Sequence, residues 1–290
     1  MLGVSPAYFI SRFGDRFSPD DVATGIDELA AIGYAAAQLE IYHLDSIDRW
    51  SRGGMQRTLD RAAAAGLRIP QFVGHCLLNG FIDDDALASA LGIAEIAAIV
   101  AMLDPTRCPV VTVPLPTYRV GSTFAVDAAA VSARIARARV KLAEMARIAT
   151  EAGFRFAVEV VPGAVIGDLL ETTSILQSIE AELSLTDNGS HRWLGINLDT
   201  GHAWAQKRLL YALPATLGPR IFGTHLCDNF GHENLSLAPG RGSIDWTLFT
   251  NALRSSGYTG SWDIEIHCRP EDAIARYSEA RAFMGALGCA

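Results

Sequence analysis

Short apolar runs alternate along the chain with longer stretches in which apolar residues recur at helical spacing. The short runs are rich in β-branched residues and mostly do not alternate with polar ones, which is typical of parallel strands covered by helices. This pattern predicts strands near residues 3–10, 36–42, 69–74, 108–114, 155–161, 193–199, 220–226 and 261–267. It predicts helices near residues 18–32, 50–66, 83–103, 124–153, 168–183, 203–213, 245–256 and 270–287.

Capping residues support several of these helix boundaries. The segment Ser18-Pro19-Asp20-Asp21 offers a capping hydroxyl, a proline in the first turn and acids at the positive end of the helix dipole. Gly33, Gly66 and Gly153 each follow a helical stretch, where glycine commonly ends a helix.

Eight strand-plus-helix units in 290 residues favour an α/β fold of the (β/α)8 TIM barrel type over a doubly wound sheet. No glycine-rich dinucleotide fingerprint follows the first predicted strand, which weakens the sheet alternative further. No linker, low-complexity tract or long charge run marks a second domain. We therefore expect one barrel domain over residues 1–290, with its active site at the carboxyl ends of the strands.

Composition narrows the classes of partner. The net charge of −8 argues against a nucleic-acid or anionic-membrane surface, because such surfaces need clustered Lys and Arg. The five cysteines are scattered without a C-x-x-C pair, and no basic stretch precedes an apolar segment at the N-terminus. We expect a cytoplasmic protein that binds a small molecule and neither nucleic acid nor membrane, with a homo-oligomer left open.

Four of the predicted strands each carry one metal-type ligand in an otherwise apolar run: Glu159, Asp199, His225 and Glu265. Each is separated from the next by about one strand-plus-helix unit, so all four would lie at successive strand ends. A lone buried carboxylate is costly unless something neutralises it. The set predicts one divalent cation. Its three carboxylates and one imidazole suit Mn²⁺ or Mg²⁺, with Co²⁺ or Zn²⁺ as alternatives.

Loops after these strands supply further candidates. His202 opens the helix after the sixth strand, so it could orient substrate or join the metal shell, or simply bond backbone. After the seventh strand, Asp228 could hold a histidine tautomer and His232 could contact substrate, although solvated loop roles are as plausible for both. Arg241 lies between two glycines and offers a planar fork for a carboxylate or phosphate, or forms an ordinary turn.

Three more residues complete the predicted pocket. Glu40 shares a face of the second strand with Gln38 and Tyr42 and could bond a substrate hydroxyl or form a structural ion pair. His75 ends the third strand and faces the predicted site. Trp204 could wall the pocket or pack at its rim.

The order of these motifs resembles the xylose-isomerase-like barrel superfamily, and more narrowly its sugar phosphate isomerase/epimerase group. The group includes ketose 3-epimerases, inosose isomerases and dehydratases, and hydroxypyruvate isomerases. The runs that carry the resemblance are Gly33-Tyr-Ala-Ala-Ala-Gln-Leu-Glu40, Leu194-Gly-Ile-Asn-Leu-Asp199-Thr-Gly-His202, Thr224-His225-Leu-Cys-Asp228-Asn229, Pro239-Gly-Arg-Gly-Ser-Ile-Asp245-Trp246 and Asp263-Ile-Glu265.

The resemblance implies roles for the matching residues. Glu159, Asp199, His225 and Glu265 match the metal ligands. In the epimerases the two glutamates also move protons, so Glu159 and Glu265 would be the catalytic pair. His202 matches the histidine that orients substrate.

Other positions depart from the patterns of the superfamily. His75 and His232 resemble part of the additional zinc set of endonuclease IV, a DNA-repair member. The fourth strand, Val110-Val-Thr-Val-Pro-Leu-Pro, offers no histidine, and Phe230 stands where an aspartate is expected, so a three-metal site is not expected. Arg241 replaces the acid of a glycine-acid-glycine turn and hints at an anionic or unusual substrate.

Together these features favour a divalent-metal-dependent isomerase or epimerase of a ketose, inosose or related keto-sugar. A carboxylate would remove the proton beside a carbonyl and the metal would stabilise the enediolate. A metal-dependent lyase, acting by dehydration or by β-elimination on a 3-keto-glycoside, shares that step and is the main alternative. An endonuclease IV-like nuclease and a non-catalytic binding barrel are less favoured.

Overall fold

The computed structural model describes residues 1–51, 53–119, 127–185 and 192–289. Its strands are β1 Leu2–Val4, β2 Ala36–Ala37, β3 Leu39–Glu40, β4 Gln71–Val73, β5 Val110–Leu115, β6 Arg155–Val160, β7 Leu194–Asp199, β8 Ile221–His225 and β9 Trp262–Ile264. Every named strand pairs in parallel with its neighbour in the order β2-β1-β9 and β3-β4-β5-β6-β7-β8. Parallel strands with helical crossovers are what the apolar, non-alternating runs predict.

Two links close these sheets into a barrel. Gln38 separates β2 from β3, so the two short strands form one interrupted strand that belongs to both sheets. On the other side, Leu226 donates its N–H to Asp263 O (2.8 Å) and accepts from Glu265 N (3.0 Å), which joins β8 to β9. The fold is therefore the predicted TIM barrel.

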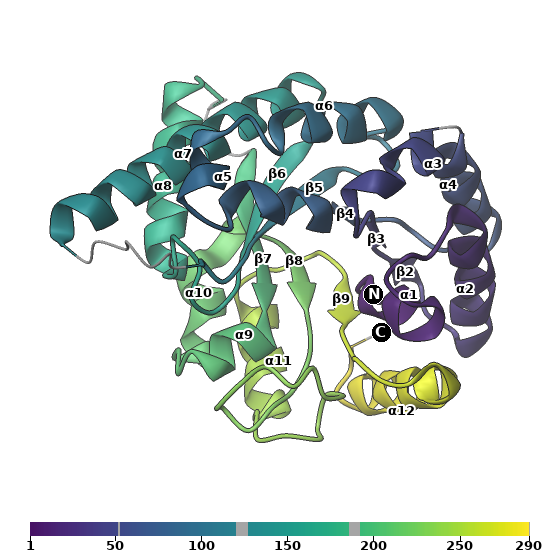
Figure 1. Cartoon of the computed structure of the whole chain (residues 1–290). Helices are drawn as coiled ribbons and strands as arrows, with labels where there is room; N and C mark the ends of the chain where they lie inside the picture. The colour runs from purple at the N-terminus through teal and green to yellow at the C-terminus, as the bar shows by residue number, and fades with distance from the viewer. Residues whose placement is uncertain (52, 120–126, 186–191, 290) are drawn as a thin grey trace.

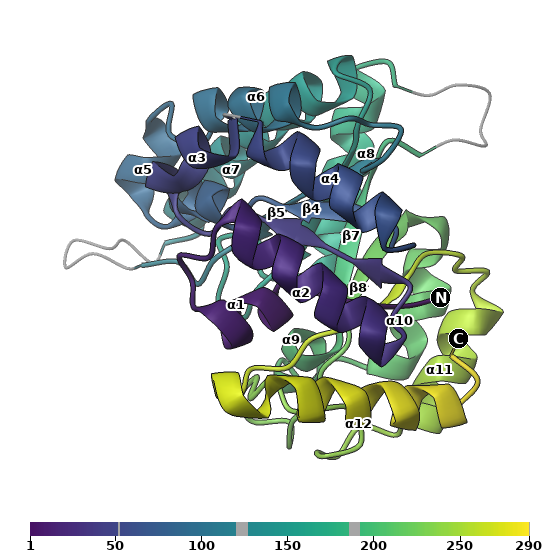
Figure 2. The ribbon, with the colours of Figure 1, turned by 90° about the vertical axis from the view of Figure 1, so that its right-hand side faces the viewer.

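Helices form the outer layer, as Figures 1 and 2 show. They are α1 Ala7–Phe13, α2 Pro19–Ile32, α3 Ile47–Ser51, α4 Gly54–Ala64, α5 Asp84–Ala88, α6 Ile93–Met102, α7 Ala128–Glu151, α8 Leu169–Glu182, α9 Thr200–Ala205, α10 Leu213–Leu217, α11 Trp246–Ser255 and α12 Ala273–Ala286. Short 3₁₀ turns are η1 Leu44–Ser46, η2 His75–Phe81, η3 Leu210–Ala212, η4 Gly218–Arg220 and η5 Pro270–Asp272. Contacts between α12 and α2 join the last unit to the first, so the helical layer is continuous there.

The expected capping box at Ser18 is confirmed. The Ser18 hydroxyl accepts from Asp21 N (3.2 Å) while the Asp21 carboxylate accepts from Ser18 N (2.7 Å). Gly33 ends α2 with a left-handed φ of 96°.

The prediction of a first strand over 3–10 is wrong beyond Val4. The Ser5 hydroxyl accepts from Ala7 N (3.2 Å) and Pro6 presets a helical φ, so the apolar run from Ala7 forms α1 instead. This early turn places Pro6, Ala7 and Ile10 over the barrel mouth.

Several predicted helices are interrupted. The stretch 83–103 divides into α5 and α6 at Gly92, whose φ is 94°, and 50–66 divides into α3 and α4 around the left-handed Gly53. The stretch 203–213 becomes α9, η3 and α10. The first residues of the predicted helix 124–153 lie outside the described part of the chain, and α7 follows from Ala128.

No described helix is long and apolar enough to cross a membrane.

Candidate active site

A small pocket of about 190 Å³ opens at the carboxyl ends of the barrel strands. It is below the roughly 300–1,000 Å³ of pockets for drug-sized ligands, so it suits a small molecule. Its walls come from every part of the barrel and are Pro6, Ala7, Ile10, Glu40, Tyr42, Val73, His75, Leu78, Pro114, Glu159, Val161, His202, His225, Asn234, Ser236, Glu265 and His267. Among the residues that the structure describes, this wall contains no lysine or arginine.

The four residues predicted to share a cation come together beside this pocket. His225 Nδ1 lies 2.9 Å from Glu159 Oε2 and 3.7 Å from Glu265 Oε1. His202 Nε2 lies 3.5 Å from Asp199 Oδ2 and 3.7 Å from Glu159 Oε1. Glu159, Asp199 and His225 are each less than a tenth exposed, so three carboxylates and two imidazoles crowd into one largely dry volume.

The hydrogen bonds orient the ring of His225 and one carboxylate oxygen of Asp199. His225 Nε2 lies 2.9 Å from Gln38 Oε1, an acceptor, so Nε2 carries a proton and Nδ1 faces the carboxylates of the cluster, 2.9 Å from Glu159 Oε2. Asp199 Oδ1 caps α9 by accepting from His202 N (2.8 Å). His225 Nδ1 and Asp199 Oδ2 are buried with no hydrogen bond of suitable geometry.

The charges in the cluster are unbalanced. Burial opposes ionisation of Glu159, but the neighbouring charge of His225 outweighs it and lowers the pKa of Glu159 to about 2. Burial, together with repulsion from Asp199 and Glu159, raises the pKa of Glu265 well above its usual range despite His225. Burial also disfavours a charged His225, yet the surrounding carboxylates raise its pKa well above 6.5. One imidazolium therefore compensates only part of the negative charge.

A divalent cation fits this donor set. Unpaired buried ligand atoms and excess negative charge are the features that a bound cation would relieve. Two groups of side chains in the described residues have ligand atoms close enough to share an ion: Glu159, Asp199 and His202, and Asp199, Cys227 and Glu265. The Cys227 thiol, 3.6 Å from Asp199 Oδ1, was not anticipated from the sequence.

Glu40 and His75, both predicted to face the site, do line the pocket. Glu40 is 3% exposed and its Oε2 has no partner. Burial, reinforced by the charge of Glu159, raises the pKa of Glu40 to about 8. The His75 ring stacks on Tyr42 with ring centroids 3.8 Å apart, and burial lowers its pKa to about 4. At neutral pH the pocket thus offers a protonated carboxyl group and a neutral imidazole.

Four other predicted residues lie outside the pocket wall. Trp204 donates to Ser243 Oγ (3.0 Å) and His232 is exposed. Arg241 pairs with Glu279 (3.2 Å) on the outside of the barrel. Asp228 was expected to hold a histidine, but in the described part of the chain its carboxylate accepts four other hydrogen bonds. The donors are the backbone N–H groups of Asn229, Gly240 and Ile244 and the indole N–H of Trp246.

Sequence reasoning missed several pocket residues. Asn234 lies 3.2 Å from His202 Nδ1 through its amide nitrogen and so fixes that ring. Asn197 donates to Glu159 Oε2 (2.8 Å) from within β7. Asn197 could have been found by strand periodicity, since it lies two residues before Asp199. Asn234 and Ser236 lie in a loop with no periodic signal.

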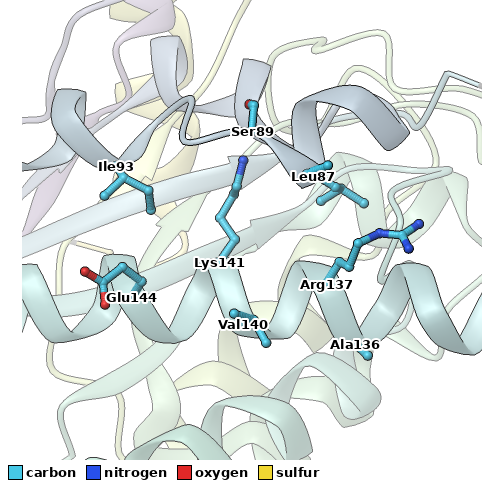
Figure 3. A pocket seen from close by; sticks show the side chains of 9 residues that line it. Leu87, Ser89, Ile93, Ala136, Arg137, Val140, Lys141 and Glu144 are labelled. Atoms are coloured by element: carbon cyan, nitrogen blue, oxygen red, sulfur yellow. The ribbon is translucent and has the colours of Figure 1, made fainter.

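A larger hollow lies away from this site. It has about 620 Å³ and lies between α7 and the α5–α6 segment, as Figure 3 shows. Its one buried cation, Lys141, reaches from α7 to the carbonyl oxygens of Gly80, Ala86 and Leu91 at 3.0, 2.5 and 3.1 Å. All three ammonium protons are satisfied, so this lysine holds the broken helix together and offers no free reactive group.

Comparisons with known proteins agree with this architecture. Three similar solved structures are D-psicose 3-epimerase in the presence of D-fructose (17% identity, TM-score 0.74, 99% of this chain and 98% of that one), the E. coli 3-keto-D-glucoside 4-epimerase YcjR (16%, 0.73, 98% and 98%), and the IolI protein with a bound zinc atom (16%, 0.72, 99% and 96%). Identities this low show a shared fold. No curated protein sequence matches the chain.

The family model described as "Xylose isomerase-like TIM barrel" matches residues 26–287. The matched range contains β2 to β9 and every residue of the charged cluster. The parallel barrel, the cluster at its carboxyl end and this match over nearly the whole chain lead to one conclusion: the protein belongs to the xylose isomerase-like TIM barrel family.

Proposed function

We propose that this protein is a divalent-metal-dependent isomerase or epimerase of a ketose, inosose or related keto-sugar. The observation that carries the proposal is the buried cluster in which Glu159, Asp199 and Glu265 crowd around His225, with no hydrogen bond of suitable geometry at His225 Nδ1 or Asp199 Oδ2. Similar folds include sugar epimerases, one of them solved with D-fructose and another acting on a 3-keto-glucoside.

In this proposal Glu159, Asp199, His225 and Glu265 hold the cation. When bound, the cation supplies Lewis-acid stabilisation of the negative charge that develops on a substrate carbonyl oxygen. Mn²⁺ or Mg²⁺ suits the oxygen-rich set, whereas the nearby imidazole nitrogen and thiol sulfur would favour binding of Zn²⁺ or Co²⁺. The ion seen in IolI is zinc.

Glu159 and Glu265 carry the proton transfer. They lie on neighbouring sides of His225, with Oε atoms 2.9 and 3.7 Å from its Nδ1. Placed on either side of a bound substrate, one removes the proton from the carbon beside the carbonyl and the other returns it. His202 orients a substrate oxygen, and Glu40, with its unpaired Oε2, donates a hydrogen bond to a hydroxyl.

Hydrogen exchange tests this function directly. The protein is incubated in D₂O with Mn²⁺ or Zn²⁺ and a panel of ketoses, inososes and 3-keto-glycosides, and NMR follows deuterium entering the substrate or product. We expect exchange at the carbon beside the carbonyl, and its loss in Glu159→Gln and Glu265→Gln. Glu144→Gln on the surface of α7 is the matched control.

The outcomes separate the rival readings. Exchange with release of a leaving group indicates the lyase alternative on the same first step. Turnover with every substrate hydrogen retained indicates hydride shift and removes the proposed proton transfer. Turnover that survives both substitutions removes the two glutamates from the mechanism.

A further inference from the structure

A second hollow lies directly beside the small pocket of the charged cluster, which is called the metal pocket from here on. It has about 420 Å³ and is lined by Leu237, Ala238, Arg241, Ile266, His267, Cys268, Arg269, Asp272 and Arg276. His267 lines both hollows. Its N–H donates to Ser236 O (3.1 Å), and Ser236 lines the metal pocket while Leu237 lines the second hollow. His267 and the chain segment Ser236–Leu237 therefore lie at the border of both hollows.

The hollow is rich in guanidinium groups, which offer donors to an anion. Its wall carries three of them and one carboxylate, and two further acids beyond the wall, Glu271 and Glu279, also pair with these arginines. Arg269 pairs with Asp272 (3.0 Å) and Glu271 (3.3 Å). Arg241 and Arg276 both approach the same oxygen, Glu279 Oε2, at 3.2 and 3.5 Å. Because these two guanidinium groups share one carboxylate oxygen, most of their N–H groups remain free. Their planar forks could donate paired hydrogen bonds to the oxygens of a bound oxyanion.

The loop that carries Arg241 is rigidly held. Buried Asp228 accepts hydrogen bonds from Gly240 N (3.0 Å), Ile244 N (3.1 Å) and the Trp246 indole (2.8 Å). Gly240 has a φ of 85°, and a Cβ there would lie 2.7 Å from the Phe283 ring of α12. A Cβ at Gly242 would lie 2.4 Å from Asn229 O, so the loop is closely packed on both sides of the arginine, against α12 on one side and against Asn229 on the other. A preorganised loop loses less entropy when Arg241 engages a ligand.

We propose that this arginine-lined hollow binds an oxyanion group, phosphate or carboxylate, of a substrate whose keto-polyol part occupies the metal pocket. Only the placement of the keto-polyol part in the metal pocket rests on the proposed function. Among the described residues, the wall of the metal pocket has no lysine or arginine, so the hollow beside it is where a negative group meets guanidinium cations. His267, exposed at the partition, contacts the substrate where it passes between the two volumes.

Anion binding is measured first, without any turnover. The full-length protein is titrated with inorganic phosphate, and separately with acetate, by calorimetry at low ionic strength. We expect millimolar phosphate binding that weakens about tenfold in Arg241→Gln and in Arg276→Gln, since each removes a charge-assisted hydrogen bond. Arg61→Gln is the matched control, because Arg61 is a similarly exposed arginine on α4 that pairs with Asp27 of α2, away from the hollow. Preference for acetate over phosphate would assign the group as a carboxylate.

Kinetics then connect the hollow to the substrate. A phosphorylated ketose or a keto-sugar acid should have a lower KM than its uncharged counterpart, and Arg241→Gln should remove that advantage while kcat changes little. Phosphate affinity unchanged in both arginine variants, or no binding of either anion, overturns the inference even if uncharged keto-sugars are turned over. Anion binding without turnover of any keto-sugar leaves the hollow in place and instead counts against the proposed function.

Discussion

Two buried groups of charges lie at opposite ends of the barrel, and they differ in how well they are satisfied. At the amino end, Glu180 and Arg220 form a 2.7 Å ion pair with both side chains almost fully buried. Glu180 Oε1 also accepts from Trp193 N and Leu194 N, and Arg220 donates to Leu194 O. At the carboxyl end, Glu159, Asp199 and Glu265 lie beside the imidazoles of His202 and His225, and two ligand atoms make no hydrogen bond of suitable geometry.

The difference separates charges that the fold satisfies from charges that it leaves available to a ligand. The Glu180–Arg220 pair balances one charge against one, and its remaining hydrogen bonds go to neighbouring backbone groups, so it locks α8 to β7 and β8. The cluster at the mouth has more negative charge than its imidazolium compensates, and it lies beside a pocket whose wall includes Glu159, His225 and Glu265. Unsatisfied buried atoms persist where a ligand completes them. Pocket size alone would have pointed elsewhere, to the groove beside Lys141 in Figure 3.

The largest effect should come from Glu265→Gln. Removing this carboxylate takes away a proposed ligand, so affinity for Mn²⁺ or Zn²⁺ should fall by more than the roughly 10–100-fold that loss of an outer partner costs. In the metal-free protein the same change should leave stability equal or higher, because burial and like charges already raise the pKa of Glu265. Equilibrium dialysis gives the affinity and thermal unfolding with and without metal gives the stability.

A metal-dependent rise in unfolding temperature of equal size in wild type and Glu265→Gln would contradict this prediction. Glu144→Gln on the surface controls for the change of net charge.

Arg220→Ala should show the opposite pattern, a loss of stability without a loss of metal affinity. It leaves Glu180 buried without its cation, which costs about 3–5 kcal/mol of stability, while metal affinity should not change. Urea unfolding measures the loss, and Arg147→Ala, whose two acid partners are on the surface of α7, should lose no more than about 1 kcal/mol. A loss as small as that of the control would mean that the amino-end pair is not the structural lock that its bonding indicates.

Glu40→Gln tests the pocket through pH. The pKa of Glu40 is raised from 4.5 to about 8 in the folded protein by burial. The folded state therefore holds this proton more tightly than the unfolded state. The contribution of Glu40 to the free energy of unfolding is fully present below about pH 4.5 and declines as the pH rises towards 8. The glutamine variant lacks that decline, so in metal-free protein it should gain up to a few kcal/mol over wild type between about pH 5 and pH 9. Urea unfolding across this range checks it, with exposed Glu233→Gln as control. Parallel stability curves would contradict it.

The sequence predicted the barrel and singled out the residues of the charged cluster because both depend on local signals. Apolar runs with helical spacers specify parallel strands, and a charged residue in such a run, as at Glu159 or Asp199, is conspicuous. The first strand failed beyond Val4 because the hydroxyl of Ser5 and the ring of Pro6 start a helix that apolarity alone does not reveal. The metal, the proton-transfer roles, the substrate, the number of subunits and the single domain over 1–290 stay predictions.

The hydrogen bonds beneath the charged cluster could not be predicted, because they depend on which side chains meet across the barrel. Gln38, Gln71 and Asn197 come from three different strand positions and form a buried chain of amides. Gln71 Nε2 donates to Gln38 Oε1 (3.3 Å) and to Asn197 Oδ1 (3.0 Å), and Asn197 continues to Glu159. The approach requires Gly223, where a Cβ would lie 2.1 Å from Gln71 Oε1. Each residue alone reads as an ordinary polar position in a strand.

Gln38→Leu should therefore have a smaller effect of the same kind as Glu265→Gln. Gln38 Oε1 meets two N–H donors, from Gln71 and His225, and its amide nitrogen meets Thr224 O, which fixes the amide orientation. Leucine fills similar space but cannot accept the His225 Nε2 proton, so the imidazole is free to place its proton on Nδ1, the atom that must be bare to bind a cation. Metal affinity should fall about 10–100-fold, with metal-free stability changed less than in Arg220→Ala.

Nitrogen NMR of the His225 ring distinguishes this positioning role from simple loss of packing. Wild type in the presence of Zn²⁺ should show a protonated Nε2 and a metal-shifted Nδ1. Gln38→Leu should show a mixture of tautomers at the same zinc concentration, and Gln38→Glu, which restores an acceptor, should return the ring to one tautomer. If affinity falls in Gln38→Leu while the tautomer stays unchanged, the amide chain acts through packing, and the contrast between the two ends of the barrel would rest on the ligands alone.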